Sequence, residues 1–91
     1  GDVYKRQLVG SLPYPEYDNS NDAGIISISI TVDPQGKVIS AIATVNGSKG
    51  TAFSNQKLRA SAEAAARKSR FERSTGSSNQ TGVIIYIFKQ N

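Results

Sequence analysis

The sequence predicts a small α+β domain in which a three-stranded antiparallel sheet carries one helix on one face, in the order strand, strand, helix, strand. Three observations predict this class: a β-branched alternation over residues 24–32, an alanine-rich helical pattern over 56–72 and an apolar run over 83–88. The length of 91 residues is that of one domain. A domain of this size buries roughly 60–65% of the surface of its unfolded chain, so its core is modest.

The first expected strand, residues 24–32, alternates isoleucine or valine with serine or threonine. Its apolar positions are Ile26, Ile28, Ile30 and Val32. The pattern ends at Asp33-Pro34-Gln35-Gly36, where Pro34 fixes φ for a turn and Gly36 is free to take a positive φ. A second strand is expected over residues 37–45, so that residues 25–45 form a β-hairpin.

Good helix formers dominate residues 56–72, and we expect one helix there after a loop over residues 46–54. Either Ser54 or Asn55 is suited to cap its first turn. Small side chains recur at helical spacing, which allows the helix to lie close to the sheet. This small face comprises Leu58, Ala62, Ala65 and Ser69. A polar loop then leads to a third strand over residues 83–88, which is apolar on both faces.

The N-terminal part of the chain has no periodic pattern. Residues 1–7 are interpreted as a linker or an expression scar, which leaves residues 8–91 as the domain. Within it, Pro13 and Pro15 are expected to hold the chain extended around Tyr14 ahead of the first strand.

The composition argues against an enzyme and against a metal or cofactor site. The chain has no cysteine and no histidine, which removes thiolate nucleophiles, Ser-His pairs and the common zinc sites. Asp18, Ser20 and Asp22 imitate the start of a calcium loop, but Ala23 and Ser29 stand where that loop needs glycine and glutamate. We therefore expect no catalytic residue, no metal and no cofactor.

Basic residues exceed acidic ones by 11 to 7, which gives a net charge of +4. Six of the basic residues lie between positions 57 and 73, and no aromatic residue is interleaved with them before Phe71. This arrangement favours a solvated outer helix face over a stacking surface for single-stranded nucleic acid. A small basic RNA-binding module is kept as a distant alternative. No run approaches the roughly 18 apolar residues of a membrane span, so no direct membrane insertion of this fragment is expected.

Four features in a fixed order resemble the C-terminal domain of TonB energy transducers, over residues 8–91. They are the entry segment Pro13-Tyr14-Pro15, the strand and turn from Gly24 to Val38, the alanine-rich helix with Arg70-Phe71 near its end, and the closing strand from Gly82 to Phe88. The alanine-rich helix and Tyr86-x-Phe88 are similar to the Bacteroidetes-type versions. The chain departs from the family at Arg73, where many members have proline, and over residues 16–23.

The resemblance implies a periplasmic domain of a protein anchored in the inner membrane of a Gram-negative bacterium. Such a domain binds the TonB box of outer-membrane transporters by strand addition. It then transmits the pull of inner-membrane proton-driven motor proteins, with which the transducer associates through its upstream region, so that a siderophore or other nutrient is taken up. The partner-binding edge would be the last strand: Val83, Ile84, Ile85, Tyr86, Ile87 and Phe88. Auxiliary contacts would come from Tyr14, Tyr17, Arg70 and Arg73.

Two further readings accompany this expectation. The same fold serves a TolA-like protein, or an envelope protein fused to a sensor or peptidase, which binds a protein segment without driving transport. An open last strand also predicts a homodimer formed by pairing or swapping of that strand.

Overall fold

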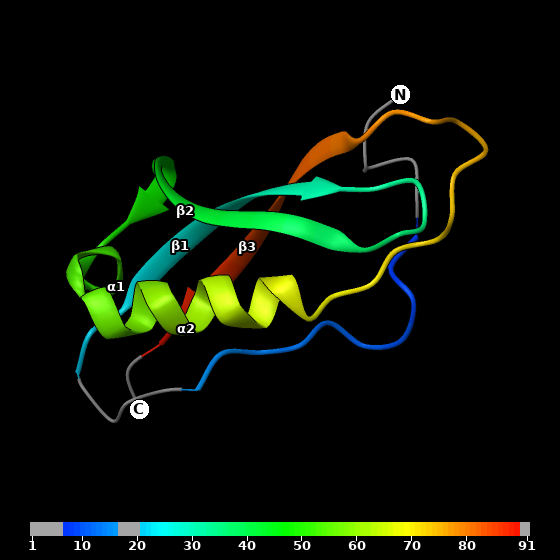
Figure 1. Cartoon of the computed structure of the whole chain (residues 1–91). Helices are drawn as coiled ribbons and strands as arrows, with labels where there is room; N and C mark the ends of the chain where they lie inside the picture. The colour runs from blue at the N-terminus through cyan, green and yellow to red at the C-terminus, as the bar shows by residue number, and fades with distance from the viewer. Residues whose placement is uncertain (1–6, 17–20, 90–91) are drawn as a thin grey trace.

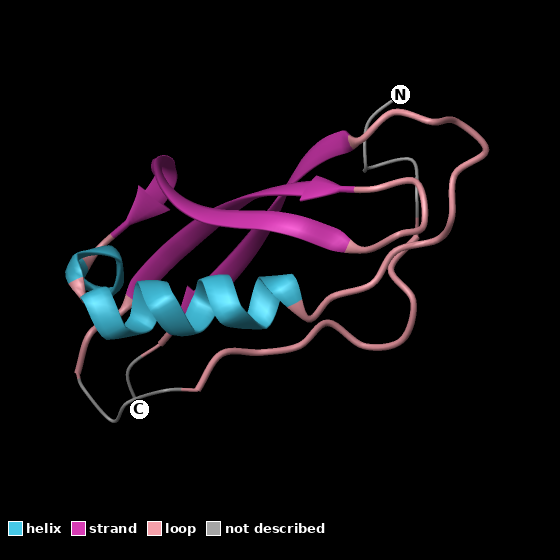
Figure 2. Cartoon of the chain, in the orientation of Figure 1, coloured by secondary structure: helices cyan, strands magenta, loops and turns pink. Residues whose placement is uncertain are grey.

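The computed structural model describes residues 7–16 and 21–89 and confirms the α+β class. Three antiparallel strands form one sheet, and the helices lie on one of its faces (Figures 1 and 2). The elements in chain order are β1 (Gly24–Val32), β2 (Val38–Lys49), α1 (Thr51–Ser54), α2 (Gln56–Arg67) and β3 (Gln80–Phe88). The helical part is thus a short helix followed by a longer one, where the sequence predicted one helix.

The sheet has the strand order β2-β1-β3, and both pairings are antiparallel. The first strand is therefore central, and the last strand of the chain lies at one edge. The pairing of β1 with β3 runs without a register shift from Gly24 opposite Phe88 to Val32 opposite Gln80. Figure 1 shows α2 crossing the face of the sheet below β2 and β1.

The predicted apolar row of β1 forms the centre of the core. Its members are Ile26, Ile28, Ile30 and Val32, each at most 1% exposed. The predicted small face is also confirmed, because Leu58, Ala62 and Ala65 of α2 are buried, and so is Ser69 just beyond the end of the helix. Asn55 caps the helix by accepting a hydrogen bond from the backbone N–H of Leu58 at 3.1 Å. No helix within the described residues is long and apolar enough to cross a membrane.

The turn between β1 and β2 is fixed by Asp33 and Gly36. The Asp33 carboxylate accepts hydrogen bonds from the backbone N–H groups of Gln35 and Lys37 at 3.0 and 2.9 Å. Gly36 has a φ of 91°, and a Cβ there would lie 1.9 Å from the carbonyl oxygen of Phe71. The positive φ expected at this glycine is confirmed, and the close approach of residue 71 is a second reason for glycine.

The predicted loop over residues 46–54 was wrong, because β2 continues to Lys49 and α1 follows at once. The extension depends on a bulge: the Ser48 hydroxyl accepts the Ser27 N–H at 2.9 Å and donates to the Thr44 carbonyl at 2.6 Å. Pairing with β1 then resumes at Ile25 opposite Lys49. The Asn-Gly sequence that suggested a loop lies inside this bulge.

Two other predicted boundaries also needed correction. The helix ends at Arg67 rather than near residue 72, because the chain leaves it to form bridges from Arg70 to Lys37 and from Phe71 to Leu8. The last strand begins at Gln80 rather than Val83. The alternation of buried and exposed residues in β3 also shows that only one of its two apolar faces is in the core.

Enlarging the small face of α2 tests this packing. Ala62 is 0% exposed between the helix and the sheet, and leucine there is expected to lower the free energy of unfolding by about 1–3 kcal/mol through overpacking. Ala60→Leu is the matched control, because Ala60 is exposed on the same helix and its replacement costs little. Urea unfolding of both variants measures the difference, and equal stabilities would contradict the close packing.

Candidate functional site

The edge strand β3 has two unlike faces. Gly82, Ile84, Tyr86 and Phe88 are buried on the face of the sheet that carries the helices. The residues between them, Val83, Ile85 and Ile87, are 41%, 47% and 62% exposed on the opposite face of the sheet. The strand therefore presents a row of three β-branched side chains to solvent.

The direction of the β3 backbone groups follows from the contacts of β1. In β1, the Ser27 N–H donates to the Ser48 hydroxyl and the Ser27 carbonyl accepts from the Thr44 hydroxyl, so both groups face β2. Backbone direction alternates along a strand, so those of Ile26 and Ile28 face β3. They lie opposite Tyr86 and Ile84, whose backbone groups must face back toward β1.

The alternate backbone groups of β3, those of Thr81, Val83, Ile85 and Ile87, consequently face away from the sheet. Within the described residues, no backbone hydrogen bond joins these outward groups to another segment. An edge of this kind is a template on which an extended peptide can pair.

The other edge of the sheet is partly covered by α2. The Glu63 carboxylate accepts the backbone N–H of Ala43 at 2.8 Å, and the Arg67 guanidinium donates to the carbonyl of Ala41 at 3.4 Å. Both of these β2 groups point away from β1, as expected from their positions opposite Ile28 and Ile30. Farther down, Phe71 donates its N–H to the carbonyl of Gly36 at 2.9 Å. Helix side chains thus cover part of the outer edge of β2, and the segment around Arg70 and Phe71 lies beside the residues just before this strand.

A strap, defined as residues 12–16, covers the part of the core that α2 leaves open. The Tyr86 hydroxyl donates a hydrogen bond to the Pro13 carbonyl at 2.8 Å, and the Tyr14 ring packs edge-on against the Tyr86 ring with centroids 5.9 Å apart. At the far end of the strap, the Glu16 N–H donates to the Ser61 hydroxyl at 3.1 Å. Burial, and secondarily the neighbouring Tyr14, raises the pKa of Tyr86 to about 12.

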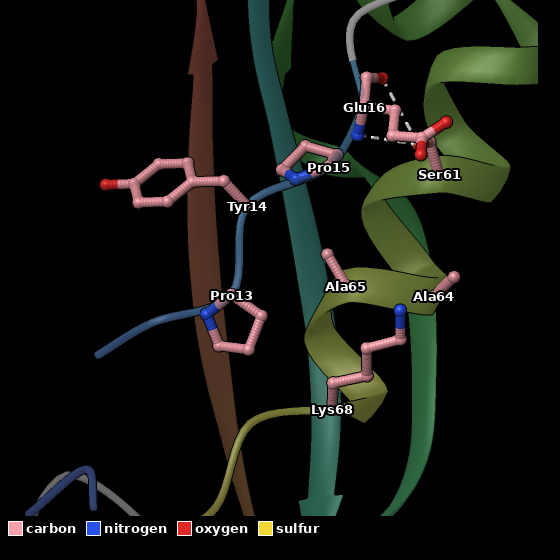
Figure 3. Close-up of a pocket in the computed structure, with 8 residues that line it drawn as sticks. All are labelled: Pro13, Tyr14, Pro15, Glu16, Ser61, Ala64, Ala65 and Lys68. Atoms are coloured by element: carbon pink, nitrogen blue, oxygen red, sulfur yellow. Dashed lines mark hydrogen bonds between the residues drawn. The ribbon is translucent and has the colours of Figure 1, made fainter. Parts of the chain in front are cut away.

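Figure 3 shows how the strap lies between β3 and α2. A hollow of about 460 Å³ separates it from the helix, lined by Pro13, Tyr14, Pro15, Glu16, Ser61, Ala64, Ala65 and Lys68. The Tyr14 ring points away from the helix and extends over the outer side of β3, and its side chain is 75% exposed. Of the predicted auxiliary contacts, Tyr14 thus lies beside the open edge.

The remaining predicted site residues are distributed differently. The side chains of Ile84, Tyr86 and Phe88 belong to the core, and their backbone groups face β1. Only the alternate residues of the predicted edge therefore present backbone groups to a partner. Arg70 lies beside Lys37 near the start of β2, across the sheet from the β3 edge. Arg73 is exposed in the chain that leads to β3, and Tyr17 lies outside the described residues.

Three of the six basic residues between positions 57 and 73 make contacts within the fold. Arg59 stacks on the Phe53 ring, with its guanidinium carbon 5.3 Å from the centroid, and also bonds the Phe53 carbonyl. Arg67 bonds the β2 edge, and Arg70 donates to the carbonyls of Arg67 and Ser69. These three side chains therefore have defined local roles within the fold.

The roles of Glu63 and Arg67 had no signal in the sequence, where they look like ordinary helix-surface charges. Across the described residues, no cluster of three or more histidine, cysteine, aspartate or glutamate residues is placed to hold a metal ion. Comparison with known proteins finds no matching family model, curated protein or solved structure. The geometry of the two sheet edges is therefore what defines the candidate site.

Removing the cap on the β2 edge tests the asymmetry of the sheet. Glu63→Ala leaves the Ala43 N–H without its acceptor and is expected to lower the free energy of unfolding by about 1 kcal/mol. It also exposes a second pairing edge, so self-association is expected to rise. Urea unfolding and sedimentation velocity measure the two effects. Glu63→Gln keeps an acceptor oxygen and is the control; if it behaves like the alanine variant, the cap is not the cause.

The strap is tested by the pH dependence of Tyr86→Phe. The tyrosine pKa is about 12 in the folded protein and roughly 10 in the unfolded chain, so its contribution is complete below pH 10 and is lost as pH rises toward 12. At pH 8 we expect the phenylalanine variant to be less stable by about 1 kcal/mol, because the bond to Pro13 is absent. That difference should shrink in urea titrations between pH 10 and 11.5. A constant difference would contradict this role.

Proposed function

We propose that this chain is the periplasmic binding domain of a TonB-type energy transducer. It engages the TonB box of outer-membrane transporters by adding that segment as a fourth strand beside β3, and it passes on the pull of an inner-membrane proton-driven motor. In this proposal the domain is a binding module, and nutrient uptake is the outcome of its pull on the transporter.

The difference between the two sheet edges is the observation that carries the proposal. Side chains of α2 bond two outward backbone groups of the β2 edge, while four residues of β3 direct outward backbone groups that bond no other segment among the described residues. A soluble domain normally blocks both of its edges, since an open edge promotes aggregation. An edge left open beside a blocked one is consistent with a site that takes up a partner strand.

Strand addition suits a module that transmits force. Backbone hydrogen bonds give affinity without demanding one sequence, which allows one domain to serve several transporters. If the partner is pulled along the strand direction, the bonds of the ladder are loaded together in shear. Strand β3 is itself bonded along its full length to the central strand β1, so a load on the partner reaches the core directly.

The resemblance to the TonB family adds the identity of the partner. Two of the features that carry this resemblance lie at the open edge: the entry segment is the strap against Tyr86, and the closing strand is β3.

The experiment that tests the proposal is an NMR titration of the labelled domain with a transporter TonB-box peptide. In the free domain the amides of Val83, Ile85 and Ile87 should exchange faster than those of Ile84 and Tyr86. On binding, that difference should disappear.

A titration at millimolar peptide that leaves the exchange of these three amides unchanged, in a monomeric sample, would overturn strand addition at β3. Shifts confined to another surface would place the partner elsewhere and favour a different envelope protein with this fold.

A pair of substitutions at Ile85 separates backbone pairing from side-chain contact. Proline removes an N–H that faces outward, which an edge strand tolerates, and is expected to weaken TonB-box binding at least about tenfold. Ile85→Thr keeps the N–H and changes the same exposed side chain, so it should retain most of the affinity. Isothermal titration calorimetry measures both, and thermal unfolding checks the fold. Equal losses would contradict pairing through this backbone group.

A further inference from the structure

The exposed row of β3 is a second feature of the same edge. Val83, Ile85 and Ile87 lie side by side on the outer face of the sheet, with exposed fractions of 41–62%. Their neighbours across β1 are the small residues Ser29 and Ser27 and then Ile25. The row is therefore a ridge of β-branched side chains at the rim of the sheet, next to a strip of serines.

The residues that form this ridge are the ones whose backbone groups face outward. In an added strand, parallel or antiparallel, the residues opposite Val83, Ile85 and Ile87 place their side chains on the same face as these three. The alternate residues of the partner point to the other face, where the strap lies. The side chains of one added segment would thus contact the ridge on one face of the sheet and the strap on the other.

On the strap side, the Tyr14 ring is the group placed to meet the partner. It packs on Tyr86, extends over the outer side of β3 and leaves most of its surface in solvent (Figure 3). A partner residue opposite Tyr86 would come beneath this ring. Burying the exposed ring against an aromatic or aliphatic side chain would be favourable, because such pairs gain both area and ring contact.

We infer that the partner segment is extended, with β-branched or other apolar residues at three alternate positions that pack on Val83, Ile85 and Ile87, and with an intervening apolar or aromatic residue that packs on Tyr14. This inference rests on the proposed strand addition and specifies the side-chain pattern that the edge selects. The ridge and the ring would both be covered in the complex, which accounts for their exposure in the free domain.

The test uses two seven-residue peptides of one composition. The first has valine at its second, fourth and sixth positions with serine elsewhere, and the second has its three valines adjacent at the centre. The alternating peptide is expected to bind at least about fivefold more tightly, because only it can place all three valines on the ridge. Calorimetry at up to millimolar peptide measures both affinities.

Variants of the ridge locate the contact. Ile85→Ser should weaken the alternating peptide about two- to fivefold and bring its affinity toward that of the other peptide. Ile42→Ser is the matched control: Ile42 is 58% exposed on the same face but lies on β2, two strands from the open edge. Its replacement should leave both affinities unchanged.

A second pair of peptides tests Tyr14. Phenylalanine replaces the serine at the third or the fifth position of the alternating peptide, and one of the two should gain affinity on the natural protein. That gain should be absent on Tyr14→Ser, in which the bonds of Pro13 and Glu16 still hold the strap. No gain from either peptide, or a gain that survives in Tyr14→Ser, would overturn the role of the ring.

The outcomes also separate this inference from the function on which it rests. If both valine peptides bind equally and the outward amides of β3 become protected, strand addition stands and the side-chain pattern is overturned. If neither peptide nor a transporter TonB box protects those amides, strand addition itself is overturned, and the inference with it.

Discussion

Because β1 lies between β2 and β3, the alternation of its side chains and backbone groups determines how both neighbouring strands are placed. Its even-numbered side chains form the core, and its backbone groups turn to β2 and β3 in strict alternation. Those two facts decide which β3 residues are buried and which backbone groups of β3 remain at the edge. The candidate site is thus a consequence of the strand order and of an unbroken register between β1 and β3.

The small face of α2 explains why the strap is needed. Alanines at positions 62, 65 and 66 bring the helix close to β2 and β1, where Glu63 and Arg67 reach the outer edge of β2. A single helix in that position leaves the buried side of β3 uncovered. Tyr86 fills this gap, and the proline-containing segment covers it through the bond to the Pro13 carbonyl. Closing one edge and leaving the other accessible are therefore two results of the same helix placement.

The sequence was informative where a local pattern determines structure. The alternation over residues 24–32, the turn at Asp33 and Gly36 and the small helix face depend on near neighbours, and they were predicted correctly. Of the two caps that the sequence allowed, Ser54 and Asn55, the structure has Asn55. The end of β2 was not, since it depends on Ser48 bonding to Ser27 from 21 positions away. The outward direction of the Val83, Ile85 and Ile87 backbone groups needs the strand order and the register, which no periodic pattern contains. The contacts of Glu63 and Arg67 with the β2 edge also depend on the tertiary arrangement and could not be predicted from the sequence.

An open edge and an apolar ridge would each be a liability in a domain without a partner, since both promote association between copies. Here they coincide on the same three residues, and the bare ring of Tyr14 lies beside them. A chain selected only for solubility would break such a strand with a charge or a proline, yet Gln80–Phe88 contains neither. The β2 edge, by contrast, is partly covered by the charged side chains of Glu63 and Arg67. This contrast within one small sheet supports the proposal that a partner strand covers the backbone and the ridge of β3 together.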